Sequence, residues 1–551
     1  MKNEMSEPLA VVDEQPKVRT LFAKFSLVND PVVSEFTGSI PEKFTEAVHR
    51  IASQEFLASN FILRNRLLLK SLIKKFHIHA GTLTDEVRNS IQLLDDPAAK
   101  LIVATHQPNL FAYGAVFKKI VMLETIKRVV EEGNCNTKIV NLFLVVDHDF
   151  VDESWIRLAQ LPSMQHSQGI MELRMPVSES KRWIMVARMP TPSHYIIHLW
   201  KSQVRSWIRR SVGDNLEKRN ILFDNLEQLW QHVEACHARA KSYADFNSFL
   251  MSRIVNETWN YSTLFVRLSE ISRVFEDGFS FLLSNAGLYS EALRQAENMF
   301  MSKGIDTGVS PSSHLQAPLW LHCDCGSKAS AKISTKGGDL TLAGPCKSCE
   351  KELEVDLGRP DNLEITNVVD QLSPRAIPIP LLLSRDLGIS SYVSGTGGIG
   401  YLVDGSYVSK KLGLSLPLIL VWPSRDSYKG IAQTEASAYL PSEGDIDQQI
   451  QSLEKRNKEY EERIRPLLLQ RAQEVKTGRP VDRILLSQIF ELKEEQRRIR
   501  QQIRIAEKVR NVTTISPCFI DYAVNFGMVK TEQVWRNHLV GNGSLAMPIL
   551  F

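Results

Sequence analysis

The segment Asn141-Leu-Phe-Leu-Val-Val-Asp147-His148-Asp149-Phe150 decides the expected fold. It is a short apolar run that ends in two carboxylates on either side of an imidazole, and such a run indicates a buried strand of a parallel sheet. Ligands of open α/β sheets bind just beyond the carboxyl ends of these strands. Because side chains alternate along an extended chain, we expect Asp147 and Asp149 to share one face and His148 to take the other. The segment therefore predicts a polar site at a sheet edge.

A second strand of the same sheet is expected upstream, over residues 101–104, where the sequence is Leu-Ile-Val-Ala. A helical run follows from about residue 112 to residue 132, and Gly133-Asn134 ends it with residues that tolerate the left-handed cap conformation. Strand, helix and strand in this order form a βαβ unit with a parallel sheet. We therefore expect His106 and Gln107, which follow the first strand, to emerge at the same edge as Asp147 and Asp149.

The composition bounds the class of protein. The chain has 551 residues, 43% of them hydrophobic, which favours a globular protein of two to four structural units. Lys and Arg number 66 and Asp and Glu 63, so the net charge of +3 argues against nucleic acid as a general partner. We find no apolar segment that could span a bilayer and no secretion signal, so we expect a cytoplasmic protein without membrane contact.

Four of the seven cysteines form two pairs, Cys323-Asp-Cys325 and Cys346-Lys-Ser-Cys349. Two such turns on adjacent hairpins can place four thiolates tetrahedrally, as a structural Zn²⁺ requires. Because cysteine fills all four positions, none stays open for substrate. The alternative is a thiol cluster without metal. The other three cysteines are expected to be small buried hydrophobes: Cys135, Cys236 and Cys518.

A glycine-rich turn follows a third expected strand, in Ser391-Tyr-Val-Ser-Gly395-Thr-Gly397-Gly398-Ile-Gly-Tyr401. A strand that runs into such a turn before a helix lets backbone N–H groups approach an anion closely. The alternative is simply a tight turn. Residues 416–422 form another apolar strand candidate, and Arg425 just beyond it could pair with a carboxylate or phosphate.

From residue 445 the apolar positions recur at alternating intervals of four and three, and the rhythm resumes after Thr477-Gly478-Arg479-Pro480. This pattern predicts an antiparallel coiled-coil hairpin, with Pro466 adjusting its first helix. The expected fold class is thus α/β, with a Rossmann-like parallel-sheet core, an inserted zinc ribbon and a C-terminal coiled-coil arm. The expected units are an N-terminal arm, loosely ordered to about residue 30, with a helical cap (1–95), a first core segment with a helical region (96–315), the ribbon (316–358), a second core segment (359–443), the hairpin (444–511) and a segment docking on the core (512–551).

Three stretches resemble the bacillithiol-biosynthesis cysteine-adding enzymes, the BshC family of cysteine ligases: Thr105-His-Gln-Pro-Asn-Leu-Phe111, Asp147-His-Asp-Phe150 and the glycine-rich stretch ending at Tyr401. The resemblance spans roughly residues 95–160 and 365–551, and the ribbon is an addition to it. It implies a Rossmann-like core, a coiled-coil arm used in homodimerisation, and a ligase that adds cysteine to the amino group of glucosaminyl-malate, an amino-sugar malate conjugate, in bacillithiol synthesis.

The candidate site residues follow from this interpretation. An imidazole would be the general base for the attacking amine, and the aspartates would orient it or hold Mg²⁺. ATP with Mg²⁺ stays open as the activating cofactor, since a free carboxylate is a poor electrophile. The alternative for each residue is a polar side chain that merely closes a strand. The catalytic candidates are His106, Asp147, His148 and Asp149, and the binding candidates are Gln107, Asn109, Gly395, Gly397, Gly398, Tyr401 and Arg425.

Two other functions stay open. The pattern His106-x-x-Asn109 after a first strand also resembles the adenylate-forming motif of class I aminoacyl-tRNA synthetases. This favours an adenylating ligase whose ribbon contacts an RNA or a carrier. A third interpretation is a non-catalytic scaffold that uses the ribbon and the hairpin as contact surfaces.

Overall fold

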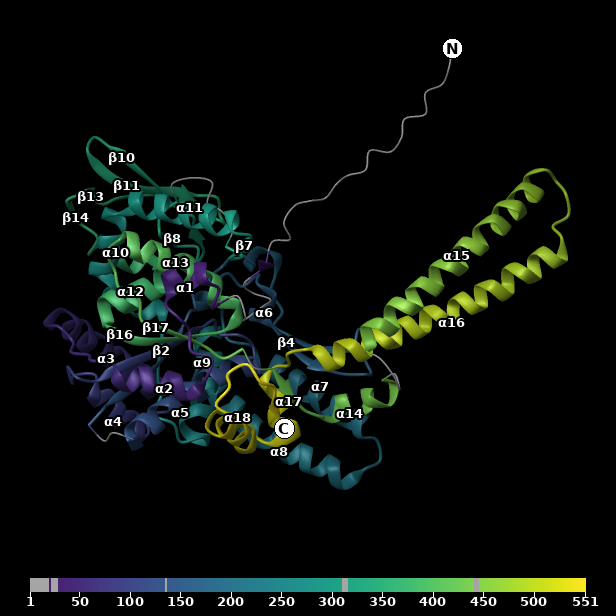
Figure 1. Cartoon of the computed structure of the whole chain (residues 1–551), viewed down its shortest axis with the longest axis horizontal. Coiled ribbons are helices and arrows are strands. Elements are labelled where there is room, and N and C mark those ends of the chain that lie inside the picture. The colour runs from purple at the N-terminus through teal and green to yellow at the C-terminus, as the bar shows by residue number, and fades with distance from the viewer. Residues whose placement is uncertain (1–18, 21–27, 134–135, 310–315, 424, 441–444) are drawn as a thin grey trace, which may run out of the picture.

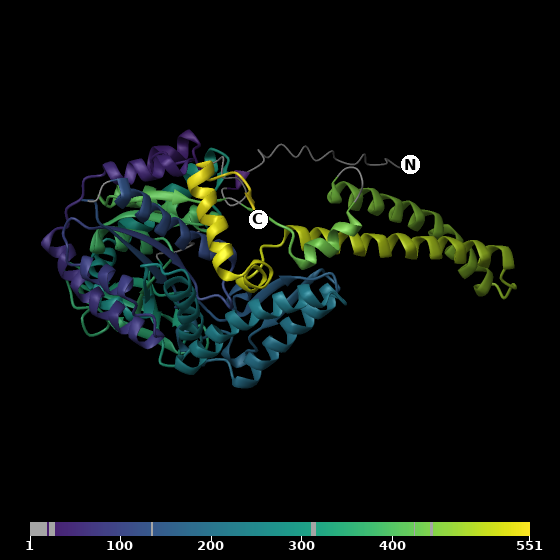
Figure 2. The same ribbon diagram turned by 90° about the horizontal axis from the view of Figure 1, so that it is seen from below.

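The computed structural model describes residues 19–20, 28–133, 136–309, 316–423, 425–440 and 445–551. Most of the expected N-terminal arm lies outside these residues, and so does Cys135. The described residues form a mixed α/β body from which a long helical hairpin projects (Figures 1 and 2).

A five-stranded sheet lies at the centre of the body, and all its neighbouring strands are parallel. The expected α/β class with a parallel sheet is confirmed. The strands, in their order across the sheet, are β17 (Leu418–Val421), β16 (Ile389–Ser394), β2 (Lys100–His106), β3 (Ile139–Val145) and β6 (Leu264–Arg267).

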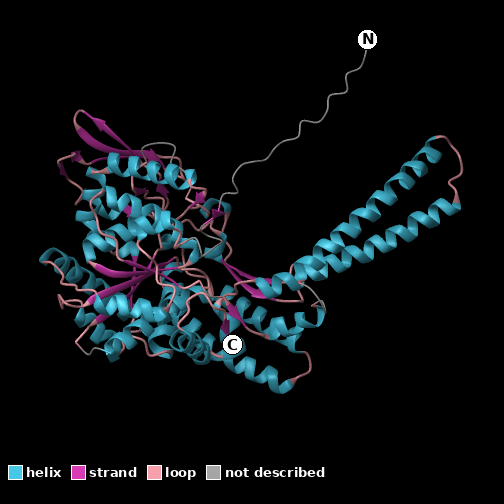
Figure 3. Cartoon of the chain, in the orientation of Figure 1, coloured by secondary structure: helices cyan, strands magenta, loops and turns pink. Residues whose placement is uncertain are grey.

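Both faces of the sheet are buried, because its strands are apolar at successive positions. In β2, Ile102 and Ala104 belong to one hydrophobic core, and Leu101 and Val103 belong to the other. Helices cover both faces (Figure 3). The first core includes residues of α2 (Phe44–Ser53), α5 (Gly114–Gly133), α7 (His194–Val212), α8 (Leu216–Arg239), α9 (Tyr243–Arg253), α17 (Phe519–Phe526) and α18 (Met528–Asn542). The second includes residues of α1 (Pro31–Thr37), α4 (Asp85–Leu93), α10 (Glu276–Ser284), α11 (Ala286–Ser302), α12 (Pro378–Leu387) and α13 (Ile399–Lys411), while α3 (Asn60–Ala80) contributes to both.

The chain leaves the two central strands in opposite directions across the sheet. From β2 it passes through α5 to β3, the neighbour on one side, and His106 pairs with Val145 in the parallel register. From β16 it passes through α13 to β17, the neighbour on the other side. The strand order therefore reverses between β2 and β16, and in open α/β sheets such a switch point is where ligands bind.

The cysteine ribbon consists of two small sheets. One has the order β15 (Leu372–Pro374), β8 (Leu319–His322), β9 (Lys328–Ala329), and the other β10 (Lys332–Lys336), β11 (Asp339–Pro345), β12 (Glu352–Asp356). Ser373 of β15, from the segment that leads back to the core, pairs with Trp320 of β8. The ribbon is thus continued by a strand that follows it in the chain.

The hairpin consists of α15 (Ile446–Lys476) and α16 (Arg483–Thr514). The residues that it buries include Ile450, Leu453 and Ile464 in α15, at positions that the sequence pattern predicts. Pro466 lies inside α15, which continues as one helix. None of the helices among the described residues combines the length and apolarity needed to cross a bilayer.

Shorter elements complete the chain: β1 (Arg19–Thr20) with β7 (Ile305–Asp306), β4 (Leu158–Pro162) with β5 (Ile170–Arg174), β13 (Gly358–Arg359) with β14 (Asn362–Leu363), β18 (Asp426–Ser427) with β19 (Ile549–Leu550), α6 (Ser154–Arg157) and α14 (Ile431–Ala436). The C-terminal segment packs on the core, with the ring of Phe519 4.2 Å from that of Phe117.

Candidate functional site

Lys119 of α5 lies between the ends of the two central strands. Its ammonium donates a hydrogen bond of 2.9 Å to the backbone oxygen of Thr105 at the end of β2. A Cβ on Gly395, directly after β16, would lie 3.3 Å from the Lys119 Cε. Burial lowers the pKa of Lys119 to about 8. A cation is therefore held at the switch point of the sheet.

The glycine turn begins at Gly395 and continues through the short helix Thr396–Gly398 into α13. The N-terminus of α13 has no side-chain cap, so its first N–H groups are not satisfied in that way. A Cβ on Gly397 would meet nothing within 4 Å, whereas one on Gly400 would overlap the Thr307 carbonyl oxygen. Gly400 is therefore required by packing, while Gly395 leaves the backbone bare beside Lys119 and Gly397 leaves it bare in open space.

Asp149 joins the segments that follow β2 and β3. Its Oδ2 accepts a 2.9 Å hydrogen bond from Gln107 Nε2, and its Oδ1 lies 3.9 Å from Lys328 Nζ. Burial raises the pKa of the Tyr401 phenol, and the carboxylates of Asp149 and Glu153 add to the rise. Tyr401 lies in the first turn of α13. Segments far apart in the sequence meet at this edge of the sheet.

The two candidate histidines are held neutral. Burial lowers the pKa of His106 to about 3, with the charge of Lys119 as a second cause. Burial also lowers the pKa of His148 well below its usual value, followed by the charges of Lys328 and His322. An imidazole with so low a pKa is a weak general base near pH 7, and each ring is weakened in this way because it is desolvated beside a cation. Near pH 7 they can donate or accept hydrogen bonds as neutral rings.

Asp147 has different neighbours from Asp149. Its fully buried carboxylate accepts hydrogen bonds from the backbone N–H and the hydroxyl of Ser269, at 2.9 and 2.6 Å. Burial raises its pKa, which the nearby Arg267 opposes. The expected shared face of the two aspartates does not appear, since the extended strand ends at Val145. Asp147 holds the loop after β6, and Asp149 faces the site.

The last two binding candidates differ in their surroundings. Asn109 is 2% exposed and lies beside His106, and its side chain opposes the fall in the pKa of that imidazole. Arg425 is exposed, and its backbone oxygen accepts a hydrogen bond from Ile549 in the C-terminal strand. Within the stretches of chain that the structure describes, its guanidinium has no ion pair or hydrogen bond, so it does not join the site.

Sequence reasoning missed Lys119 and Lys328. Nothing in the pattern of α5 separates Lys119 from its neighbour Lys118, whose ammonium lies 3.2 Å from Asp426. Lys328 follows a cysteine turn, where a lysine is ordinarily solvated. Burial lowers its pKa to about 8, against the opposing charge of Asp149. Only the tertiary structure brings both lysines to the sheet edge.

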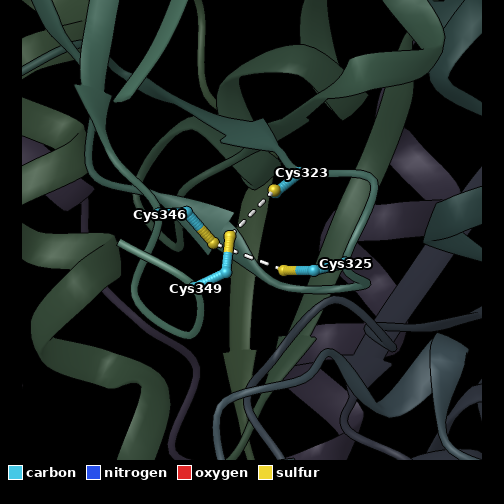
Figure 4. Close-up of side chains that lie close together, drawn as sticks. All are labelled: Cys323, Cys325, Cys346 and Cys349. Atoms are coloured by element: carbon cyan, nitrogen blue, oxygen red, sulfur yellow. Dashed lines mark hydrogen bonds between the residues drawn. The ribbon is translucent and has the colours of Figure 1, made fainter. Parts of the chain in front are cut away.

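The four ribbon cysteines form a cluster that could hold a metal ion (Figure 4), and their sulfur atoms all lie within 4.8 Å of one another. Cys323 Sγ lies 3.6 Å from Cys349 Sγ, and Cys325 Sγ lies 3.5 Å from Cys346 Sγ. Tetrahedral Zn²⁺ with Zn–S bonds of about 2.3 Å requires sulfur atoms about 3.8 Å apart. The thiols therefore fit such an ion with only small shifts.

The turns that carry these thiols are shaped for the same task. Gly326 has a φ of +89° and Glu350 one of +59°, so each pair of cysteines ends in a tight turn. Burial raises the pKa of the Cys346 thiol, but the N–H groups of Cys349 and Ser348 outweigh it and the pKa falls to about 7. Thiolate is the form that binds metal. Of the other cysteines, Cys236 and Cys518 are fully buried, as expected.

Comparisons with known proteins assign no family. No family model matches the chain, and no curated protein matches it. Among solved structures, a Campylobacter jejuni chain described as a "putative arginyl t-RNA synthetase" is similar over 83% of this chain and 97% of that chain, at 12% identity and a TM-score of 0.23. A TM-score this low supports no argument about fold or function. The function is therefore argued from the residues of this chain alone.

Proposed function

We propose that this chain is a ligase that joins the carboxyl group of cysteine to the amine of glucosaminyl-malate or a related amino sugar. The observation that carries the proposal is the meeting of the Gln107–Asp149 pair, Lys119 and the glycine turn at the carboxyl edge of the sheet. Ligands bind at this edge, next to the switch point, in open α/β sheets. The motifs that resemble the cysteine-adding ligases supply the substrate class.

A phosphate group would fit beside Lys119. The ammonium is held at the switch point, the uncapped N-terminus of α13 supplies N–H groups, and a Cβ at Gly395 would crowd the lysine. Such an arrangement favours an anion. MgATP would supply the leaving group that a free carboxylate lacks. Lys119 and the N–H groups of the turn would hold its phosphates.

The remaining residues would handle the amine and the carboxyl group. Asp149, fixed by Gln107, would orient the attacking amine and accept its proton. The neutral imidazole of His106 would act as a hydrogen-bonding group instead of a base with a pKa near neutrality. Asp147 would act as a positioning residue, because it anchors the loop that follows β6.

We propose that the cysteine cluster binds Zn²⁺ and that its role is structural, since four cysteines complete the coordination of the ion. The projecting hairpin of α15 and α16 would form a homodimer contact, as in the family that the motifs resemble. The cytoplasm, a reducing compartment, would keep the four thiols available for metal.

The test is product formation by the purified protein. Incubation with L-cysteine, glucosaminyl-malate and MgATP should yield the amide, detected by mass spectrometry. Asp149→Asn should reduce the rate by about a hundredfold or more, since general acid–base groups contribute about 10²–10⁴-fold. Asp361→Asn is the matched control, because this carboxylate is 74% exposed on the ribbon side of the chain. Absence of the amide and of ATP consumption with every amino-sugar acceptor would refute the proposal.

One observation favours a second function, an adenylating ligase that acts on RNA. Four cations line one groove on α16, with no acidic residue among the lining side chains: Lys493, Gln496, Arg497, Arg500, Gln501 and Arg504. Phosphate contacts release counterions, so RNA binding here should weaken steeply with salt. Arg500→Ala with Arg504→Ala should reduce that salt dependence. If RNA binding and its salt dependence are unchanged by both substitutions, this groove is not the RNA-binding site.

A further inference from the structure

Lys328 of the ribbon is enclosed at the sheet edge. Its side chain is 2% exposed, and its ammonium lies 4.2 Å from the ring centre of Trp320 and 4.7 Å from that of Phe150. The nearest carboxylate oxygen, Asp149 Oδ1, is 3.9 Å away. Charge-assisted hydrogen bonds are about 2.7–2.9 Å long. The Lys328–Asp149 ion pair, at 3.9 Å, is therefore too long to include a hydrogen bond.

The ammonium of Lys328 has no hydrogen-bond acceptor among the described residues, although it carries three donors. A buried polar group without a partner is costly, and a charged one more so. A second unsatisfied atom lies nearby, the Nδ1 of His148, whose side chain is 3% exposed. His148 directly precedes Asp149, whose carboxylate lies 3.9 Å from the Lys328 ammonium, so both groups belong to the same part of the sheet edge. An ammonium on a side chain only 2% exposed and an enclosed imidazole nitrogen thus both lack a hydrogen-bond partner in the part of the chain that the structure describes, which points to an acceptor that binds at this place.

The surroundings define what the acceptor would be. The guanidinium of Arg375 lies 4.0 Å from the centre of the same Trp320 ring and donates hydrogen bonds to Ala317 O and Ser330 Oγ. A second fixed cation thus reinforces the positive charge. The Asp149 side chain is 29% exposed, so the approach from solvent lies on its side.

We propose that Lys328 and His148 form an oxyanion subsite between the sheet edge and the cysteine ribbon, which binds a carboxylate or phosphoryl oxygen of the substrate. The oxygen would accept hydrogen bonds from the ammonium and from the imidazole N–H. The identity of the substrate rests on the proposed ligase function, but the presence of the subsite does not. The ribbon then belongs to the active site and supplies one of its residues.

The cysteine cluster holds Lys328 in place. Cys323 N donates to Ser327 O at 2.9 Å, Lys347 N donates to Lys328 O at 3.2 Å, and Ala329 bridges to Cys346. Both cysteine turns are therefore attached to the strand that carries the lysine. A metal ion bound by the four thiols would fix these turns, and its removal should release the subsite.

The experiment measures binding to the metal-loaded full-length protein by calorimetry, with pyrophosphate and with L-cysteine as separate probes. Lys328→Met should weaken one of them by about tenfold to a hundredfold, the range for hydrogen bonds to charged groups. Lys332→Met is the control, because this ribbon lysine is exposed and should change neither. Loss with pyrophosphate identifies a phosphoryl oxygen, and loss with cysteine identifies a carboxylate. The subsite proposal is wrong if Lys328→Met binds both probes as tightly as the wild type does. It is also wrong if the wild type binds neither probe.

Folding is controlled by metal content and thermal unfolding of each variant. Where Lys328→Met loses metal or stability, His148→Phe supplies the test, since it removes the second donor and changes no residue of the ribbon. It should weaken the same probe, and unchanged binding overturns the proposal. Removal of the metal by a chelator should weaken that probe as strongly, with recovery on adding Zn²⁺. If folded, metal-free protein binds that probe as tightly as the metal-loaded protein, the proposed dependence of the subsite on the metal is wrong. Lys328-dependent binding without amide formation would refute the ligase and leave the subsite standing.

Discussion

Replacing Lys119 by methionine should make the protein more stable and weaken its affinity for phosphate by about tenfold or more. Methionine keeps the length of the side chain and removes only the charged end. The pKa of Lys119 falls from 10.5 to about 8 through burial. At about 1.4 kcal/mol for each tenfold change, this corresponds to a few kcal/mol of destabilisation by the buried charge. Because the residue keeps part of its surface exposed to solvent, we expect a net gain of about 1–3 kcal/mol in the free energy of unfolding.

The gain should depend on pH with a definite sign. The pKa of Lys119 is lower in the folded state than in the unfolded chain. Below pH 8 both states carry the charge, and the folded state has the full desolvation penalty. Between about pH 8 and pH 10.5 the unfolded chain holds the extra proton, so the stability of the wild type rises with pH. The advantage of Lys119→Met should therefore be largest below pH 8 and small above pH 10.5.

Urea unfolding at pH 7 and pH 10 measures this difference, and calorimetry with MgAMPPNP measures the lost affinity, about tenfold or more. The adjacent lysine provides the control. Lys118 lies 3.2 Å from the buried Asp426, so Lys118→Met should destabilise the protein by about 3 kcal/mol, since it leaves this carboxylate without its cation, although the hydrogen bonds from Tyr522 and Trp535 remain. A destabilised Lys119→Met that binds the nucleotide normally would refute the assignment of Lys119 to the site.

Three further predictions follow from the structure. Gly400→Ala should destabilise the protein by about 1–3 kcal/mol, because its Cβ would overlap the Thr307 carbonyl oxygen, whereas Gly397→Ala meets open space and should not; equal unfolding midpoints would contradict this. Cys349→Ser should reduce bound zinc to well below one equivalent by elemental analysis, and retention of a full equivalent would exclude the four-thiol site. Replacing residues 446–514 by a short glycine linker should convert a dimer to a monomer in light scattering, and an unchanged mass would remove the hairpin as the dimer contact.

The arrangement of the sheet could be predicted from the sequence because its signals are local. The apolar run before Asp147 and the run before His106 each report a strand buried on both faces, and the intervening helix makes them parallel neighbours. The two helices of the hairpin could be predicted equally well, because apolar residues at intervals of four and three are a local pattern that does not depend on the rest of the chain. The spacing of the paired cysteines likewise indicates a cluster that could hold a metal ion.

The side-chain geometry of the site could not be predicted in the same way. Asp147 and Asp149 diverge because the strand ends at Val145, before it reaches either aspartate, and the Ser269 hydroxyl donates a hydrogen bond to Asp147. The neutrality of His106 depends on burial and on Lys119, which lies in the following helix. Lys328 reaches Asp149 across 179 positions of sequence, and no periodicity reports such a contact. Each of these features depends on tertiary packing.

The most direct test of the central claim is a crystal structure of the protein with MgAMPPNP and L-cysteine bound. We predict that density for the phosphates lies beside Lys119 and the turn at Gly395, and that density for cysteine lies next to Asp149. Ligand density on another face of the protein, with this edge of the sheet unchanged at saturating concentrations, would contradict the account.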